Sequence, residues 1–269
     1  MKRLIAAAAC TTMILASVFA CSSASAEHPP SAPKKKKAKS QPTPVVDPLQ
    51  SLTYMRQGLV LMQQGQYDEA LQRFQEADRI APGNATNHNM MGLCYLRQGQ
   101  FDQALEHFNQ ALELVPLFTD ARNNRGATYL AMGQLHLAEV DFVAVLGDST
   151  YPHAKQVNYN LGLTYLKRSQ LGAAEESFRR AIVPPNPVFD AYLRLAEIAQ
   201  RQGQLARAKV LLEEARINFP EMTQVSLELG KLLLLMGQTD EAAPYLQQVI
   251  ADAPDSEYAD TARNLLGAG

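Results

Sequence analysis

The fold is decided by residues 51–84, SLTYMRQGLVLMQQGQYDEALQRFQEADRIAPGN, which continue without a gap into residues 85–118, ATNHNMMGLCYLRQGQFDQALEHFNQALELVPLF. The second stretch repeats the pattern of the first at a separation of 34 residues. The matched pairs are Gly58 and Gly92, Gly65 and Gly99, Tyr67 and Phe101, Ala70 and Ala104, Phe74 and Phe108, Ala77 and Ala111, and Pro82 and Pro116. Such self-similarity at a fixed period predicts a repeat protein.

The period continues to the end of the chain, with steps of 34, 34, 36, 34 and 34 residues. The small residue of the first half of each unit recurs as Gly58, Gly92, Gly126, Gly162, Ala196 and Gly230, and that of the second half as Ala70, Ala104, Ala138, Ala174, Ala208 and Ala242. We expect two helices to cross at these sites, because a larger side chain would separate their backbones. The six predicted repeats are residues 51–84, 85–118, 119–152, 155–188, 189–222 and 223–256, with a capping helix over 257–266.

Glycine and proline mark the expected helix ends. Glycines such as Gly99 follow the first helix, where a left-handed position favours glycine, but Ser169 takes this place in the fourth repeat. The turn at 148–153 accounts for the two extra residues in the period. Pro244 is expected to kink or shorten the second helix of the sixth repeat.

A 34-residue helix-pair period is the signature of the tetratricopeptide repeat (TPR). This resemblance implies an all-α, right-handed superhelical solenoid of six TPR helix pairs. In such a solenoid the first helix of each pair lines the concave face.

Residues 1–26 are predicted to be a targeting segment rather than part of the fold. Lys2 and Arg3 precede the largely apolar residues 4–20, as in a secretory signal. Two processing sites compete, Ala24-Ser25-Ala26 and the lipobox-like Val18-Phe19-Ala20-Cys21. We expect lipidation of Cys21. The residue after it is Ser22 and not aspartate, and the resemblance to lipoprotein sorting in enterobacteria then implies an outer-membrane location. The alternative is cleavage after Ala26 and a soluble periplasmic protein.

Residues 27–48 are predicted to be a disordered linker, and residues 49–269 the solenoid. The linker is rich in proline and contains a lysine run, so it offers little apolar surface to bury. Seven of the 25 Lys+Arg precede residue 48 but only two of the 27 Asp+Glu, which leaves the solenoid with a net charge of −7. Nucleic acid is therefore an improbable partner, because its affinity depends on neutralising phosphates.

The sequence contains no pattern typical of catalysis. Its five histidines show no metal-ligand spacing, and neither a HExxH motif nor a phosphate-binding loop is present. Cys94 occupies a helix position that is usually small and buried, which indicates an inert thiol. We expect no enzyme activity, no cofactor, no metal and no small-molecule substrate.

The candidate site is the surface formed by positions 2, 5, 9 and 12 of each repeat, which face the concave side of a TPR solenoid. The predicted partner-binding residues are Leu52, Met55, Leu59, Met62, Asn89, Leu93, Leu96, Asn123, Asn124, Leu130, Tyr159, Asn160 and Leu163. A Met/Leu stripe normally belongs to a core, but these positions are additional to the packing set. We expect the stripe to bind an amphipathic helix or an extended apolar peptide; the alternative is that the N-terminal linker folds over it. The same positions become charged in repeats five and six, as at Asp190, Glu197 and Lys231.

Three segments resemble the PilF/PilW/Tgl pilotins of the type IV pilus system: 123–126 (NNRG), 148–152 (DSTYP) and 160–163 (NLGL). The resemblance implies an outer-membrane lipoprotein that binds secretin subunits through its groove and promotes their localisation and assembly. The alternative is a periplasmic TPR adaptor for peptidoglycan enzymes, similar to the NlpI-type lipoproteins.

Overall fold

The computed structural model describes residues 48–267, and this range contains thirteen α-helices and no strand. The helices are α1 (Pro48–Gln63), α2 (Tyr67–Ile80), α3 (Ala85–Arg97), α4 (Phe101–Leu114), α5 (Thr119–Ala131), α6 (Leu135–Leu146), α7 (Ala154–Lys167), α8 (Leu171–Ala181), α9 (Phe189–Arg201), α10 (Leu205–Asn218), α11 (Thr223–Leu235), α12 (Thr239–Asp252) and α13 (Glu257–Gly267). The predicted all-α fold is confirmed. Six helix pairs occupy the six predicted repeats, and α13 follows them.

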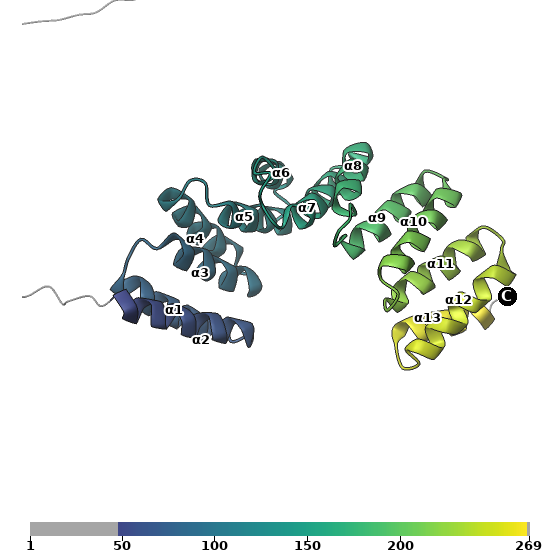
Figure 1. The fold of residues 1–269 in the computed structure, drawn as a ribbon, viewed down its shortest axis with the longest axis horizontal. Coiled ribbons are helices and arrows are strands. Elements are labelled where there is room, and N and C mark those ends of the chain that lie inside the picture. Colours follow the sequence, from purple (N-terminus) through teal and green to yellow (C-terminus); the bar gives the residue numbers. More distant parts are fainter. Residues whose placement is uncertain (1–47, 268–269) are drawn as a thin grey trace, which may run out of the picture. The chain divides into compact units, whose positions relative to one another are not determined.

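Each odd-numbered helix packs on the even-numbered helix that follows it, and each pair packs on the next pair (Figure 1). We call α1, α3, α5, α7, α9 and α11 the A helices and their partners the B helices. The A helices α1, α3, α5 and α7 also contact one another in sequence. They therefore form one side of the layer, and B helices such as α6 and α8 form the other (Figure 1).

The core of a repeat is a large side chain of the B helix set into a small residue of the A helix. Phe108 is completely buried, and a methyl group added to Gly92 would lie 2.6 Å from its ring. The same contact recurs in the first, third and fourth repeats, and Leu246 replaces the ring in the sixth. Full burial of one such side chain contributes about 1.5–3 kcal/mol. This close approach explains why the sequence keeps a small residue at each crossing.

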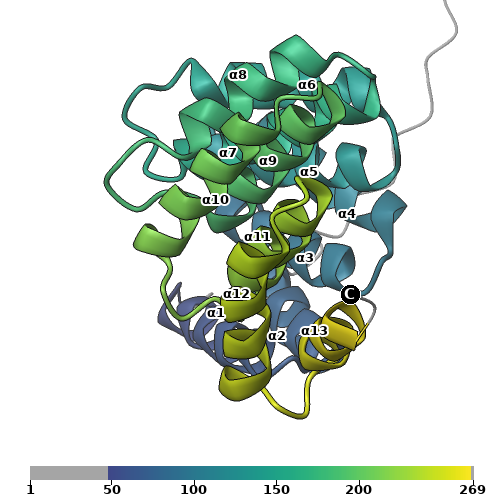
Figure 2. The ribbon, with the colours of Figure 1, turned by 90° about the vertical axis from the view of Figure 1, so that its right-hand side faces the viewer.

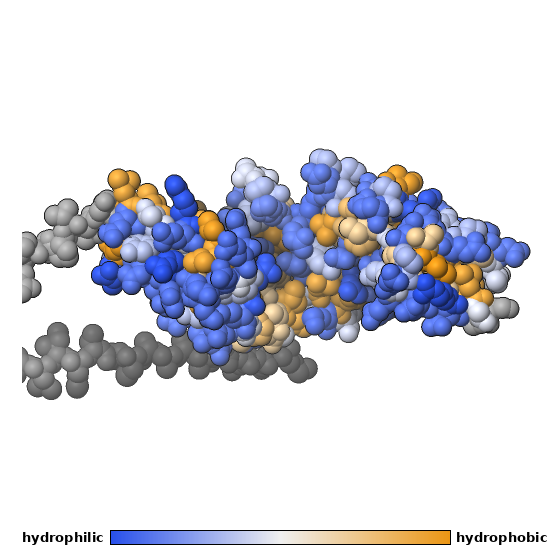
Figure 3. Space-filling model, turned by 90° about the horizontal axis from the view of Figure 1, so that it is seen from below, coloured by the Kyte–Doolittle hydropathy of each residue, from blue (hydrophilic) through white to orange (hydrophobic). Residues whose placement is uncertain are grey.

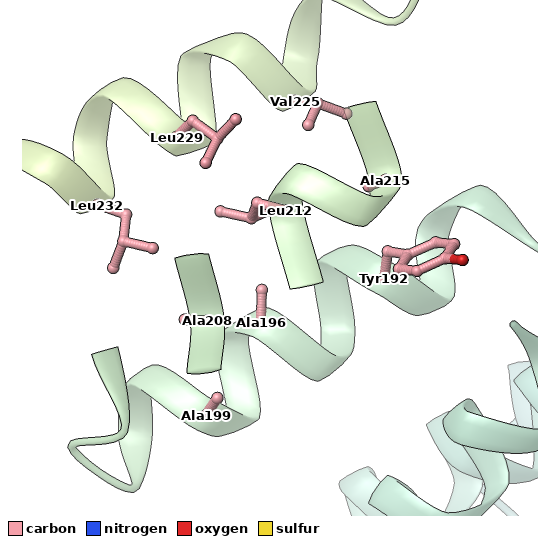
Figure 4. Close-up of a cluster of buried hydrophobic side chains, with 9 residues drawn as sticks. All are labelled: Tyr192, Ala196, Ala199, Ala208, Leu212, Ala215, Val225, Leu229 and Leu232. Carbon is pink, nitrogen blue, oxygen red and sulfur yellow. The ribbon is translucent and has the colours of Figure 1, made fainter. Parts of the chain in front are cut away.

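Neighbouring repeats bury each other's apolar side chains. In the cluster shown in Figure 4, Leu212 of α10 lies between Ala196 of α9 and Leu229 of α11. Val225 and Leu232 of α11 complete the cluster, and every one of these side chains is buried. A repeat thus needs its neighbour to bury its apolar residues, as expected of a solenoid.

The ends of the helices follow the predicted turn chemistry. Gly99 has φ +73°, and Ser169 adopts the same left-handed region with φ +60°. Helix α13 packs against α12 and α11 at the C-terminal end (Figure 2), as a capping helix should. The expectation that Pro244 shortens the last B helix is wrong, because α12 continues through it from Thr239 to Asp252. The proline lies near the start of the helix, where its missing N–H removes a single backbone hydrogen bond.

The predicted targeting segment, Cys21 and residues 27–47 lie outside the described residues, so their interpretation stays a prediction. Pro48, which we assigned to the linker, is the first residue of α1. Within residues 48–267, no helix combines the length and the apolar character needed to cross a membrane.

Candidate partner-binding groove

The predicted stripe of the first repeat is only partly exposed. Leu52 and Leu59 are 56% and 38% exposed, and Met62 is half-buried. Met55 is buried, with Asn84 Nδ2 3.6 Å from its Sδ. Its assignment to the binding surface is therefore corrected, because α3 and the turn before it cover the side chain. Leu52 and Leu59 remain as the exposed apolar residues of this stripe.

The predicted apolar residues of repeats two to four are half-buried, because each of these A helices packs against the A helix of the adjacent repeat. This group comprises Leu93, Leu96, Leu130, Tyr159 and Leu163. The Tyr159 ring packs 5.7 Å from the ring of Phe178. Figure 3 shows the solenoid from below, where apolar patches alternate with polar surface. The candidate site is thus a discontinuous apolar surface rather than an unbroken stripe.

The predicted asparagines have different environments. Asn89 is buried and accepts a hydrogen bond from Asn124, with 3.0 Å between Nδ2 and Oδ1. Asn89 is therefore corrected from a partner contact to a link between α3 and α5. Asn123 and Asn160 are half-buried, and the Oδ1 atom of Asn123 has no hydrogen-bond partner within the protein. This oxygen is itself buried, so a bound partner could not reach it without a rearrangement of the side chain.

The A-helix surface of repeats five and six is polar, as the sequence predicts. It holds a cavity of about 270 Å³ lined mainly by polar side chains. Asp190, Leu193, Arg194, Glu197, Gln200, Gln224 and Glu228 line it. Glu197 pairs with Arg194 at 3.0 Å, and Glu228 pairs with Lys231 at 2.9 Å. Because these charges are paired, the cavity would suit polar groups better than a single buried ion.

A buried ion pair that the sequence analysis missed joins the A helix α5 to the B helix α6. Arg125 of α5 donates to both carboxylate oxygens of Asp141 in α6, at 2.8 and 2.7 Å. It also donates to Asn109 of α4 at 2.8 Å, and Asp141 is only 2% exposed. The hydrogen bonds to Asp141 raise the pKa of Arg125. The pair fixes three helices of repeats two and three relative to one another.

The sequence analysis also missed the contact between His88 and His107, whose Nδ1 atoms lie 3.4 Å apart. Asp78 lies 3.5 Å from Nε2 of His88, and burial followed by the His88 charge lowers the pKa of His107. Nineteen residues separate the two histidines, so no spacing motif reveals the pair. Nevertheless, the part of the chain that the structure describes has no group of three His, Cys, Asp or Glu side chains suited to a metal. Cys94 is fully buried, and burial raises its pKa to about 11.

Comparison with known families agrees with this architecture. Models described as "Tetratricopeptide repeat" match residues 49–116 and 83–143, residues 125–187, and residues 199–266. The chain is a tetratricopeptide-repeat protein. A comparison with curated protein sequences finds no match.

Several solved TPR structures are similar to this one. PilW, described as a widely conserved type IV pilus biogenesis factor, aligns with a TM-score of 0.69 at 24% identity, over 78% of this chain and 97% of PilW. PilF of Pseudomonas aeruginosa aligns with a TM-score of 0.68 at 19% identity, over 82% of this chain and 98% of PilF. YrrB, a TPR protein with an unusual peptide-binding site, aligns with a TM-score of 0.53 at 19% identity, over 71% of this chain and 97% of YrrB. The predicted resemblance to the PilF/PilW group is confirmed at the level of the fold.

Proposed function

We propose that this TPR protein is a pilotin, an outer-membrane lipoprotein anchored through Cys21 that binds secretin subunits on its A-helix surface. It would promote their localisation and assembly for type IV pilus biogenesis. The observation that carries the proposal is the match of the solenoid to nearly the full lengths of PilW and PilF, 97% and 98%. A TPR scaffold binds protein partners, and these two neighbours supply the pilus context.

The binding surface supports an apolar partner segment. Leu52 and Leu59 are exposed on α1, whereas most large apolar residues of the solenoid are buried. Such a surface would shield an apolar secretin segment until contacts between secretin subunits replace it. The process is equilibrium binding without turnover.

The test is the formation of heat-resistant secretin multimers in cells that lack the gene, complemented with wild type or with variants. The doubly substituted Leu52→Asp, Leu59→Asp variant should fail to restore multimers although secretin monomer is still made. Both side chains are exposed, so the solenoid should stay folded. Val210→Asp is the matched control, because Val210 is 52% exposed on the B-helix side.

Multimers that persist in the deletion strain would overturn the pilotin proposal and favour the envelope-adaptor alternative. Multimers restored equally by both variants would place secretin binding elsewhere on the molecule. A circular-dichroism spectrum of each purified variant shows whether lost complementation reflects unfolding.

A further inference from the structure

Helix α6 lies on the side of the layer opposite the A helices (Figure 1), and it carries a stripe of exposed apolar residues. The stripe consists of Leu137, Val140, Val143 and Ala144, which are exposed; the three larger side chains are 44%, 51% and 51% exposed. Their spacing of three, six and seven residues from Leu137 places them on one face of the helix. They are separate from the core face of α6, which is formed by buried residues such as Phe142.

The other repeats show that packing does not require apolar residues here. The positions equivalent to Val143 and Ala144 are occupied by Gln75, Asn109, Arg179, Glu213 and Gln247, and by Glu76, Gln110, Arg180, Glu214 and Gln248, respectively. All ten are polar or charged, as expected for a face in contact with water. Repeat three alone among the six presents the complete apolar stripe, and exposed apolar patches of this kind mark interaction sites.

The surface beside the stripe is hollowed on both flanks. Both cavities have mixed linings. One of about 290 Å³ is lined by apolar residues such as Leu117 and Ala144 together with Thr119, Arg122 and Asp148. The other, of about 370 Å³, is lined by apolar residues such as Val143, Leu146 and Tyr165 together with Glu176, Ser177 and Arg180. Leu117 is 88% exposed. A helix lying along α6 would therefore find ridges and grooves into which its own side chains fit.

We propose that this stripe is a self-association surface, on which the α6 helices of two copies of this chain pack antiparallel about a two-fold axis near Val140. The antiparallel arrangement sets Leu137 of one copy against the small Ala144 of the other when the axis passes between residues 140 and 141. A large side chain thus meets a small one at both ends, which makes the face self-complementary. Val140 meets its own equivalent at the centre.

The charges of α6 also favour a second copy over other occupants. Its acidic residues are both satisfied internally, Glu139 by Arg168 and Asp141 by Arg125. Two copies would therefore not bring unpaired like charges together. The helix contains no lysine or arginine, whereas membrane-surface helices are rich in them. An acidic or basic partner helix would find no free opposite charge on α6.

The association should be weak, because one helix face buries less than the roughly 1,200 Å² typical of stable interfaces. A dimer of this kind leaves the A-helix surfaces of both copies free. It would therefore present two partner-binding surfaces, and its formation does not depend on what they bind. Self-association through α6 can therefore be tested separately from the proposal that secretin is the partner.

The test is sedimentation equilibrium of the full chain, with Cys10 and Cys21 changed to serine, at concentrations from roughly 20 μM to 1 mM to cover weak dissociation constants. The wild-type α6 sequence should show a reversible monomer–dimer equilibrium. Val140→Glu should weaken dimerisation at least tenfold. Val210→Glu is the matched control, because Val210 occupies the equivalent position of repeat five with 52% exposure and should leave the equilibrium unchanged.

A second measurement tests the geometry. Val140→Cys should form a disulfide-linked dimer under mild oxidation, since the two-fold axis brings residue 140 next to its own equivalent, and Val210→Cys should not. The remaining Cys94 is fully buried and should not cross-link. A monomer throughout the concentration range would overturn the proposal and leave the stripe to a different protein. Equal effects at residues 140 and 210 would overturn it as well.

Discussion

Replacing Arg125 with methionine should strongly destabilise the solenoid, because it leaves the carboxylate of Asp141 buried without its main partner. Asp141 is only 2% exposed, and the next cation, Arg122, lies 3.9 Å from its Oδ1. The substitution also removes the 2.8 Å hydrogen bond from Arg125 to Asn109. Breaking a buried pair from one side costs about 3–5 kcal/mol. This loss is a large share of the roughly 5–15 kcal/mol that stabilises a typical domain.

The assay is urea denaturation followed by far-UV circular dichroism. Arg263→Met is the control, since Arg263 pairs with Asp260 at 2.7 Å but both side chains are exposed, 46% and 73%. Such a surface pair should contribute about 0–1 kcal/mol. In the double variant Arg125→Met, Asp141→Leu no buried charge is left unpaired, so most of the stability should return. If Arg125→Met costs no more than the control, or if the double variant is at least as unstable as the single one, the reasoning is refuted.

Three further predictions concern single positions. Ser169→Gly should stabilise the protein by about 0.5–1 kcal/mol in the same assay, since Ser169 has φ +60°, where glycine carries no steric penalty; an unchanged or lower midpoint would contradict this. Cys94 should react with a thiol reagent at pH 8 only after denaturation, since it is fully buried and burial raises its pKa to about 11; rapid labelling of the native protein would contradict it. The hydrogen bond from Arg207 lowers the pKa of Glu175 below its usual 4.5, so its stabilisation is complete above about pH 4.5 and is lost as the pH falls through the lowered value. Glu175→Gln should reduce the acid sensitivity of the urea midpoint in that range, and an unaltered pH profile would argue against the pair.

The repeat architecture could be predicted because the same physical constraint returns six times. A small residue at each crossing, such as Gly92 under Phe108, is required wherever two helices approach closely. Chance similarity cannot reproduce this constraint at a fixed period. Even the irregular fourth repeat obeys it, and Ser169 takes up the left-handed conformation that glycine adopts elsewhere. The expected shortening of the last B helix by Pro244 was wrong, because α12 runs through the proline from Thr239 to Asp252.

The groove residues could be predicted only in part, because the sequence of one repeat does not show which of its side chains the next A helix covers. Met55 and Asn89 occupy the same position of successive repeats and are both buried, since the following A helix covers them. Leu52 and Leu59 remain exposed at neighbouring positions of α1. Contacts between A helices depend on side chains from two repeats together. Single-repeat periodicity carries no information on such pairs. The Arg125–Asp141 pair lies within repeat three and was missed because no other repeat has an ion pair at these positions, so it leaves no periodic signal.

Repeat three combines a buried ion pair, Arg125–Asp141, with an apolar exterior on α6. Because α6 is apolar around most of its circumference, hydrophobic burial selects its rotation only weakly apart from the fit of Phe142 against Gly126. Rotation that buried Val140 would expose Asp141 and break its two hydrogen bonds to Arg125. We infer that the buried pair determines which face of α6 points outward, and hence where the stripe lies. On this reasoning, the Arg125→Met, Asp141→Leu variant regains stability but loses a unique α6 orientation, which faster amide exchange along 135–146 would reveal.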